Sequence, residues 1–243
     1  DGLLHRQSAG AGGRGRCAGR GEALRRLLTM RTALVALALI AAPVWAASDF
    51  AYTQRVAAGE TVIDSRPLAD CKRASLPGAR CLPAEDFLGP SRQLPSERNI
   101  LWLLGTAGLD GGESVLVVGQ DETDRDFVAG LLYLAGQKSV RILSLPPRTQ
   151  GTVSGAERGM VRSAVWTAPM RDHLWVLGAD ILRSKPALID ARQAGATPSP
   201  GAGVVIADDA RQAIARFTQL RAGRGLAVRV HPGGLAMTTG SAR

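Results

Sequence analysis

The apolar positions of this chain alternate between short continuous runs and longer stretches with helical spacing. SVLVV (114–118) is strongly apolar, which predicts a central parallel strand buried on both faces. RDFVAGLLYLAG (125–136) has apolar residues three and four positions apart and ends in a glycine, so it predicts a helix. SVRIL (139–143) predicts the next strand. This alternation favours an α/β fold, a parallel sheet flanked by helices.

Weaker patterns of the same kind extend in both directions from this centre. The elements expected upstream are a strand at 61–64, a brief helix over 67–74, an extended piece within 76–83, and helical segments within 84–108 that Pro90 and Pro95 interrupt. The elements expected downstream are a helix over 173–184, a strand within 186–192, a loop over 197–203, a strand, acidic turn and helix within 204–223, and a last strand within 226–234. A second α/β segment is therefore expected.

The two segments echo each other. TVIDSR (61–66) is similar to ALIDAR (187–192), and the strand–loop–helix–strand order of the centre returns from VVIADDAR onward. Such self-similarity suggests a duplication. The second copy is shorter, because residues 190 and 207 are 17 positions apart, whereas the corresponding residues 64 and 119 are 55 apart. Residues 146–164 are rich in Pro, Gly, Ser and Thr and are predicted to form a linker.

The N-terminal part has the pattern of an export signal. Residues 30–46, MRTALVALALIAAPVWA, combine a basic start, a short apolar run and small residues at the end. The run is too short to span a bilayer comfortably. We therefore expect a signal peptide cleaved before Ala47 and a periplasmic or secreted protein without a stable membrane span. The other interpretation is a buried Ala/Leu helix. Residues 1–29, which are rich in Gly and Arg, are expected to be untranslated upstream sequence or a disordered leader.

The charge of the chain changes when this segment is set aside. The whole chain carries +9, but residues 1–46 hold seven Arg and two acidic residues, which leaves 23 basic and 19 acidic residues, or +4. Without a basic cluster, this balance gives little support for nucleic-acid binding. Cys17 belongs to the leader, so Cys71 and Cys81 are the remaining cysteines. In an oxidising compartment their even number permits a disulfide but does not establish one.

Residues 64–83, DSRPLADCKRASLPGARCLP, resemble the opening of a rhodanese-like domain. The pattern of that family is Asp-x-Arg, some nine residues, and then His-Ile-Pro-Gly-Ala. The positions that fall on it are Asp64 and Arg66, followed by Ser75, Leu76, Pro77, Gly78 and Ala79. The resemblance covers about residues 58–145 well and 173–236 poorly. It implies a rhodanese-like domain over 47–145 and a degenerate second half-domain over 165–243.

Rhodanese-like enzymes carry sulfane sulfur on a cysteine directly after the central strand, in a loop of the form Cys-x-x-Gly-x-Arg. Backbone N–H groups and a helix N-terminus there stabilise the thiolate. The family's spacing to Gly136 places the nucleophile at Gly119, its loop glycine at Glu122 and its arginine at Asp124. Arg125 comes one place late, and the second copy offers Ile206 or Ala207. No catalytic residue is therefore expected in this loop, which consists of Gly119, Gln120, Asp121, Glu122, Thr123, Asp124 and Arg125.

The loop also has the wrong charge for an anionic sulfur donor. Residues 119–126 contain four acidic residues and one arginine, a formal charge of −3. Thiosulfate would be repelled by roughly 1 kcal/mol per close charge pair in water-like surroundings. A metal site is a poorer interpretation of these acids, since their spacing does not fit a calcium loop. We expect Thr123 or Asp124 to cap the following helix instead.

Other candidate residues favour structural roles. Asp64 and Arg66 are expected to share one face of a strand and anchor neighbouring loops. His173 and His231 have no partners at metal-binding spacing, so neither a metal nor a cofactor is expected. The serines, Ser154 before Gly155 and Ser163, lack the strand–turn–helix context of a serine hydrolase. A structural role is also favoured for the cysteines, as a disulfide or as two small buried residues.

The leading hypothesis is an exported, catalytically inactive rhodanese-like protein that acts as a binding or scaffolding module. Its partner, a protein or a small molecule, is not indicated by the sequence. The alternative is an enzyme, a sulfurtransferase or thiol-redox protein that uses Cys71 or Cys81. A third hypothesis is a remnant without any retained activity.

Overall fold

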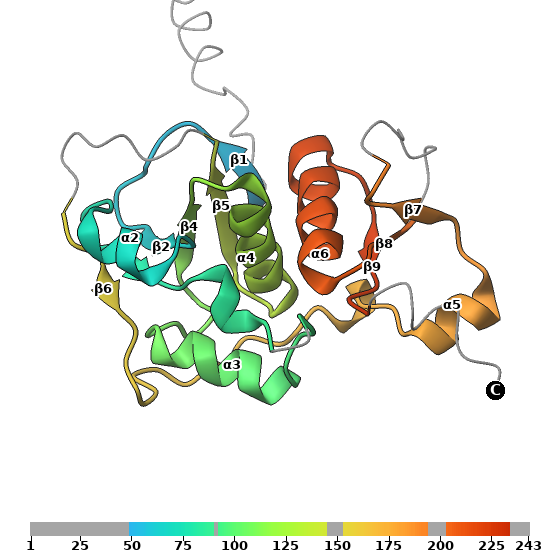
Figure 1. Ribbon diagram of the computed structural model, residues 1–243, viewed down its shortest axis with the longest axis horizontal. Helices are drawn as coiled ribbons and strands as arrows, with labels where there is room; N and C mark the ends of the chain where they lie inside the picture. Colours follow the sequence, from blue (N-terminus) through green and yellow to red (C-terminus); the bar gives the residue numbers. More distant parts are fainter. Residues whose placement is uncertain (1–48, 90–91, 145–152, 194–202, 234–243) are drawn as a thin grey trace, which may run out of the picture. The chain divides into compact units, whose positions relative to one another are not determined.

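The structure is a computed structural model that describes residues 49–89, 92–144, 153–193 and 203–233 (Figure 1). The predicted leader, signal peptide and cleavage site lie outside these ranges, as do residues 146–152 of the predicted linker and most of the predicted loop at 197–203. The residues in these ranges all belong to one compact unit. No helix in the described ranges has the length and apolar character needed to cross a bilayer.

The first sheet contains six strands. They are β1 (Phe50–Thr53), β2 (Thr61–Asp64), β3 (Arg80–Cys81), β4 (Ser114–Val118), β5 (Ser139–Leu143) and β6 (Ala156–Glu157). Their order is β1-β5-β4-β2-β3-β6, and every pair is parallel. The strongly apolar β4 occupies the interior of the sheet, as the sequence predicts. β1 was not predicted, and β6 comes from the segment predicted to be a linker.

Four helical elements accompany this sheet. They are α2 (Leu68–Arg73), the 3-10 turn η1 (Ala84–Phe87), α3 (Glu97–Thr106) and α4 (Glu122–Leu134). Because side chains alternate along a strand, each strand serves two faces. Ile63, Val115 and Val117 belong to the core that includes α3 and α4, and the intervening Leu116 and Val118 belong to a separate apolar cluster. The predicted α/β fold with a parallel sheet is therefore confirmed.

The described residues that follow β6 include a smaller parallel sheet. Its elements are the 3-10 turn η2 (Asp172–Leu174), α5 (Gly178–Ser184), β7 (Leu188–Asp190), β8 (Val204–Ile206), α6 (Ala210–Thr218), the π-helical turn η3 (Gln219–Gly223) and β9 (Arg229–Val230). The strand order is β7-β8-β9. The predicted helix over 173–184 is wrong in its first half. Trp175 there forms a parallel bridge to Val230, so the chain is extended until α5 begins.

The two sheets show the same local architecture. The neighbouring parallel strands β2, β4 and β5 correspond to β7, β8 and β9, and α4 corresponds to α6. Trp175 lies beside β9 as β1 lies beside β5. We call residues 50–143 the first repeat and residues 175–230 the second repeat. The second repeat has only residues 191–203 between its first two strands, where the first has α2, β3, η1 and α3.

The two repeats meet along α4 and α6, which pack side by side (Figure 1). One continuous core links them, because Phe127 and Leu131 of α4 cluster with Ile214 and Phe217 of α6. Gly130 allows the close approach. A Cβ atom at this position would clash with the Thr218 hydroxyl and lie 2.7 Å from Cγ2 of Ile214.

We predict that Gly130→Ala lowers the free energy of unfolding by about 1–2 kcal/mol. Overpacking typically costs about 1–3 kcal/mol, and the better helix propensity of alanine offsets up to about 1 kcal/mol of that loss. Denaturant unfolding followed by circular dichroism measures the change. In the Thr218→Ala background, where the clashing hydroxyl is absent, Gly130→Ala should lower the free energy of unfolding by less than it does in the unmodified protein. Strictly additive effects would show that the helices are not in contact at Gly130.

Candidate functional site

The candidate site lies where β2 and β4 end. Asp64 and Val118 are register partners in these parallel strands, so the residues that follow them meet at the same edge of the sheet. Ligands of α/β proteins commonly bind at this carboxyl edge. A pocket of about 390 Å³ lies there, and we call it the edge pocket. It is lined by Ser65, Arg66, Pro67, Asp70, Gln120, Asp121 and Asp124.

Gly119 stands directly after β4, and the space for a side chain there is already filled. A Cβ atom on Gly119 would clash with the hydroxyl oxygen of Ser65 and lie 3.0 Å from Cβ of Arg125. Ser65 is 1% exposed, and its hydroxyl donates a hydrogen bond to the carbonyl of Val118 over 3.1 Å. A side chain at this position would therefore need Ser65 or Arg125 to move. Sequence reasoning missed Ser65 because nothing in its local pattern indicates this contact.

The loop after Gly119 leads into α4 through an aspartate cap. Asp121, rather than Thr123 or Asp124, is the N-cap residue, and its carboxylate accepts a hydrogen bond from the backbone N–H of Asp124 over 2.8 Å. The predicted caps were wrong because α4 begins earlier than the apolar pattern indicates, at Glu122. An aspartate at this position satisfies an N–H group that lacks a partner within the helix.

Arg125 and Asp126 turn into the protein and do not line the edge pocket. Arg125 Nη2 lies 3.0 Å from Oδ1 of Asp126, and both residues are buried. Tyr52 and Gln219 also donate hydrogen bonds to Oδ2 of Asp126, over 2.8 Å and 3.2 Å. Burial raises the pKa of the Asp126 carboxyl, and Arg125 opposes this shift. Burial also raises the pKa of the Tyr52 phenol, with Asp126 adding to the effect.

Arg211 of α6 brings a cation from the second repeat to the edge pocket. Its Nε lies 2.5 Å from Oδ1 of Asp124, and its Nη2 lies 3.4 Å from Oδ1 of Asp121. The pKa of the Asp124 carboxyl is raised, first by burial and also by Asp121, while Arg211 acts in the opposite direction. The sequence did not reveal Arg211, because only the packing of α4 on α6 brings it close.

Asp64 and Arg66 bind each other at the edge pocket. The buried Asp64 carboxylate accepts three hydrogen bonds from Arg66. Its Oδ1 accepts from the backbone N–H and from Nε, each over 3.0 Å, and its Oδ2 accepts from Nη2 over 2.6 Å. It also accepts one from the Ser75 hydroxyl over 2.6 Å, and Arg66 Nη2 donates to the Ala74 carbonyl. The hydrogen bond to Asp64 raises the pKa of Arg66. This guanidinium therefore ties β2 to the end of α2.

Pro77, Gly78 and Ala79 form the turn that enters β3. The Ala79 N–H donates to the Leu76 carbonyl over 3.0 Å, and Gly78 has a φ of 74°, a conformation that favours glycine. Ala79 is buried. None of the three residues lines the edge pocket. Ser75, which falls on the family's histidine position, instead reaches Asp64.

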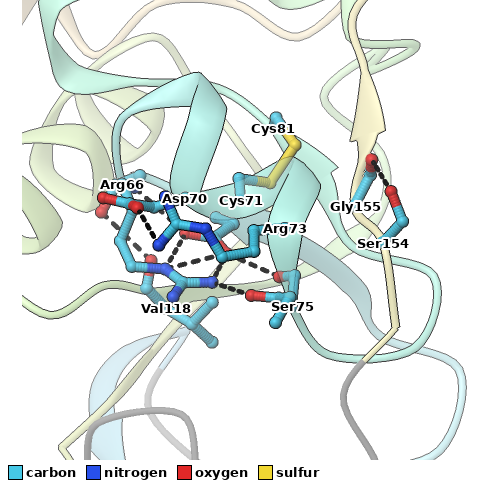
Figure 2. A network of polar contacts seen from close by, with 12 residues as sticks. Arg66, Asp70, Cys71, Arg73, Ser75, Cys81, Val118, Ser154 and Gly155 are labelled. Atoms are coloured by element: carbon cyan, nitrogen blue, oxygen red, sulfur yellow. Dashed lines mark hydrogen bonds and ion pairs between the residues drawn. A yellow bond between two sulfur atoms is a disulfide. The ribbon is translucent and has the colours of Figure 1, made fainter. Parts of the chain in front are cut away.

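Cys71 and Cys81 form a disulfide that joins α2 to β3 (Figure 2). The bridge is one of the two structural roles that the sequence left open for these cysteines. Both cysteines are fully buried, and Gly155 covers them, since a Cβ atom there would lie 2.5 Å from Sγ of Cys71 and 2.8 Å from Sγ of Cys81. The backbone N–H of Gly155 also donates to the Cys71 carbonyl over 3.0 Å. Neither sulfur lines the edge pocket.

The remaining predicted residues lie apart from the edge pocket. Nδ1 of the buried His231 donates to the Val176 carbonyl over 2.8 Å, and His173 is exposed in η2. Within the described ranges, no three His, Cys, Asp or Glu side chains form a group that could hold a metal ion. Ser154 and Ser163 lie in the segment after β5, outside the lining of this pocket.

No protein-family model and no curated protein matches the chain. Solved structures are similar in fold. A probable thiosulfate sulfurtransferase shares 20% identity with a TM-score of 0.53, over 74% of this chain and 93% of that chain. The 3-mercaptopyruvate sulfotransferase SseA from Escherichia coli, described as having the rhodanese fold, shares 13% identity with a TM-score of 0.54, over 73% and 93%. YnjE shares 15% identity with a TM-score of 0.56, over 74% of this chain and 60% of that chain.

Proposed function

We propose that this chain, whose fold is that of the rhodanese-type sulfurtransferases, is an exported, non-catalytic binding or scaffolding module. The observation that carries the proposal is the position directly after β4. Gly119 stands there, and Ser65 and Arg125 fill the space that a nucleophile's side chain would take. A sulfur carrier needs a thiolate at this point, beside the helix N-terminus that stabilises it. Glycine supplies none.

The charge of the site supports the same proposal. Asp70, Asp121 and Asp124 line the edge pocket, and Arg66 is the single cationic residue among its lining residues. That guanidinium is already bound to Asp64 and to the Ala74 carbonyl. An anionic donor such as thiosulfate would therefore meet carboxylates without an uncommitted cation in the pocket lining.

The alternative, a sulfurtransferase or thiol-redox protein, would need Cys71 or Cys81 as a free thiol. These are the only two cysteines in the described ranges, and they are bonded to each other and fully buried. Attack on a donor would require reduction of the bond and displacement of the segment around Gly155. The bridge therefore supports a structural role.

Export is proposed from the apolar segment at 30–46 and is consistent with the disulfide, since such bonds persist in oxidising compartments. A fractionation experiment tests it. The full-length protein expressed with its N-terminal segment should be recovered outside the cytoplasm and should begin at Ala47. Recovery from the cytoplasm with residues 30–46 attached would contradict export.

We predict that the purified protein forms no thiocyanate from thiosulfate and cyanide above the uncatalysed rate. It should also gain no sulfur atom in intact-mass measurements after incubation with thiosulfate or 3-mercaptopyruvate. An active thiosulfate sulfurtransferase assayed in parallel serves as the positive control. Turnover that disappears in Cys71→Ser or Cys81→Ser would contradict the proposal and support the thiol enzyme.

A further inference from the structure

A short loop after β6 carries the most exposed large apolar side chains of the described ranges. Met160 is 86% exposed and Val161 is 75% exposed, and Val165 is exposed as well. We call residues 159–165 the apolar loop. None of them lines the edge pocket. Because large apolar side chains that are exposed together commonly mark an interaction surface, the loop is a candidate contact surface of its own.

The apolar loop is anchored at both ends to α3. The backbone N–H of Gly159 donates a hydrogen bond to the carbonyl of Thr106 over 3.0 Å. Two further N–H groups, those of Ser163 and Ala164, donate to the carbonyl of Gly105 over 3.1 and 3.2 Å. These carbonyls belong to the last turn of α3, along which this part of the chain runs in Figure 1. The bend between the anchored ends, which holds the two most exposed side chains, therefore projects from the surface.

Trp102 extends this apolar surface onto α3. It precedes Gly105 and Thr106 by three and four positions, and residues with this spacing share one side of a helix. Its side chain is exposed. Tryptophan is enriched at the boundary between the headgroups and the hydrocarbon core of a bilayer. The helix therefore places a side chain suited to a membrane interface beside the apolar loop.

The loop and its surroundings carry uncompensated positive charge. Residues 158–171 contain three arginines and no acidic residue. Arg162 within the loop and Arg98, four positions before the tryptophan of α3, are both exposed. Among the described residues, neither guanidinium has an ion-pair partner. Glu157, just before the loop, is bound by Lys72. Free guanidinium groups beside exposed apolar side chains complement a surface of anionic groups.

The size of this surface favours a bilayer over a protein partner. Its four apolar side chains cover less than the about 800 Å² that each partner buries in a stable protein interface. Binding to a bilayer has no such requirement, because its strength grows with each apolar side chain that enters the headgroup region. Cations add to this binding when the lipids are anionic.

We propose that the apolar loop docks this protein on an anionic phospholipid bilayer, with Met160 and Val161 inserted among the headgroups. Arg98 and Arg162 lie against the lipid phosphates in this arrangement. Because only short side chains enter the boundary region, the interaction is peripheral and reversible. The inference goes beyond the proposed binding or scaffolding role, since it names a partner for a surface apart from the edge pocket.

Co-sedimentation with lipid vesicles tests the proposal. The chain from Ala47, which contains the compact unit, is used because the apolar residues 30–46 would bind vesicles by themselves. Vesicles of phosphatidylcholine with about 30% phosphatidylglycerol should bind it at least about fivefold more tightly than phosphatidylcholine alone, since each arginine near an anionic surface adds to the attraction. This preference should shrink between about 20 and about 200 mM salt, because exposed charges are screened over that range. Equal binding to both vesicles, or to neither, would overturn the proposal.

Two double variants locate the contact. Met160→Ser/Val161→Ser should weaken binding to the anionic vesicles at least about tenfold, because two side chains no longer gain from leaving water. Circular dichroism should show an unchanged fold, since both side chains are exposed. Leu177→Ser/Leu182→Ser, which alters exposed leucines at α5, is the matched control and should bind normally. An equal loss in the two double variants, or none in the first, would overturn the assignment.

The arginines are tested by the lipid preference rather than by total binding. Arg98→Gln/Arg162→Gln should remove most of the preference for phosphatidylglycerol and leave the binding to phosphatidylcholine alone unchanged. Arg183→Gln/Lys185→Gln, which removes two cations at the end of α5, should keep the preference. A preference that survives the first double variant would contradict the role of these arginines.

Fluorescence quenching reports which face meets the bilayer. Lipids with brominated acyl chains should quench the tryptophan fluorescence of the bound protein, and Trp102→Phe should abolish this quenching, because Trp166 and Trp175 are only partly exposed and lie outside the loop. Quenching that persists in Trp102→Phe would place another face on the membrane and overturn the proposal. The thiocyanate assay measures the absence of sulfur transfer separately, so neither result decides the other.

Discussion

Replacing Asp64 with alanine is expected to lower the free energy of unfolding by about 3–5 kcal/mol, the range for breaking a buried ion pair from one side. The fully buried Asp64 carboxylate accepts hydrogen bonds from the backbone and side chain of Arg66 and from Ser75. Its removal leaves the Arg66 guanidinium, which is only 16% exposed, without a counter-ion. Urea unfolding followed by far-ultraviolet circular dichroism measures the loss.

The second repeat supplies the matched control for this substitution. Asp190 accepts the same hydrogen bonds from Arg192, from the backbone N–H, Nε and Nη2 over 3.0, 2.9 and 2.6 Å. The Arg192 side chain, however, is 50% exposed. Asp190→Ala should therefore cost no more than about 1 kcal/mol, as for surface ion pairs. Equal losses in the two variants would show that burial does not determine how much this Asp–Arg ion pair contributes to the free energy of unfolding.

Removing the disulfide is expected to be the next largest effect. Cys71→Ala/Cys81→Ala should lower the free energy of unfolding by roughly 2–3 kcal/mol, because the ten-residue separation closes a short loop in the unfolded chain. The loss should appear in equilibrium unfolding without a reductant. The buried sulfurs also predict slow reduction of the native protein, with fast reduction only in denaturant.

The unmodified protein in a reducing buffer provides the control. After it has been unfolded and its disulfide reduced, it should refold to a free energy of unfolding close to that of the double alanine variant. A double variant as stable as the oxidised protein would mean that other contacts hold α2 and β3 in place, such as the Arg66–Ala74 hydrogen bond between β2 and α2 and the pairing of β2 with β3.

The sequence was sufficient for elements whose signals are local. β4 and α4 follow from continuous apolar character and helical spacing, and the pairing of Cys71 with Cys81 was one of two structural roles that their number permitted. Asp64 and Arg66 were identified as residues that anchor neighbouring loops. They were expected to share one face of a strand, but β2 ends at Asp64, and the two side chains bind each other. In each case the deciding residues lie close together in the chain.

The missed features depend on contacts between distant segments. β1 is four residues long and is stabilised by pairing with β5, which begins 86 positions after residue 53. Trp175 is extended because it pairs with Val230, although its neighbours favour a helix. Arg211 reaches Asp124 only because α6 packs on α4. Local propensity carries no information about such partners.

The origin of β6 has a consequence for how this protein could have evolved. β6 pairs with β3 at the edge of the first sheet, yet it lies after β5 in the chain, in the segment that leads to the second repeat. Recombination at the boundary between the repeats would separate the first sheet from its own edge strand. A repeat acquired from another gene would then bring a foreign segment to β3. We therefore expect the two repeats to have been inherited together, because replacing the second repeat would also remove or alter β6, the edge strand of the first sheet.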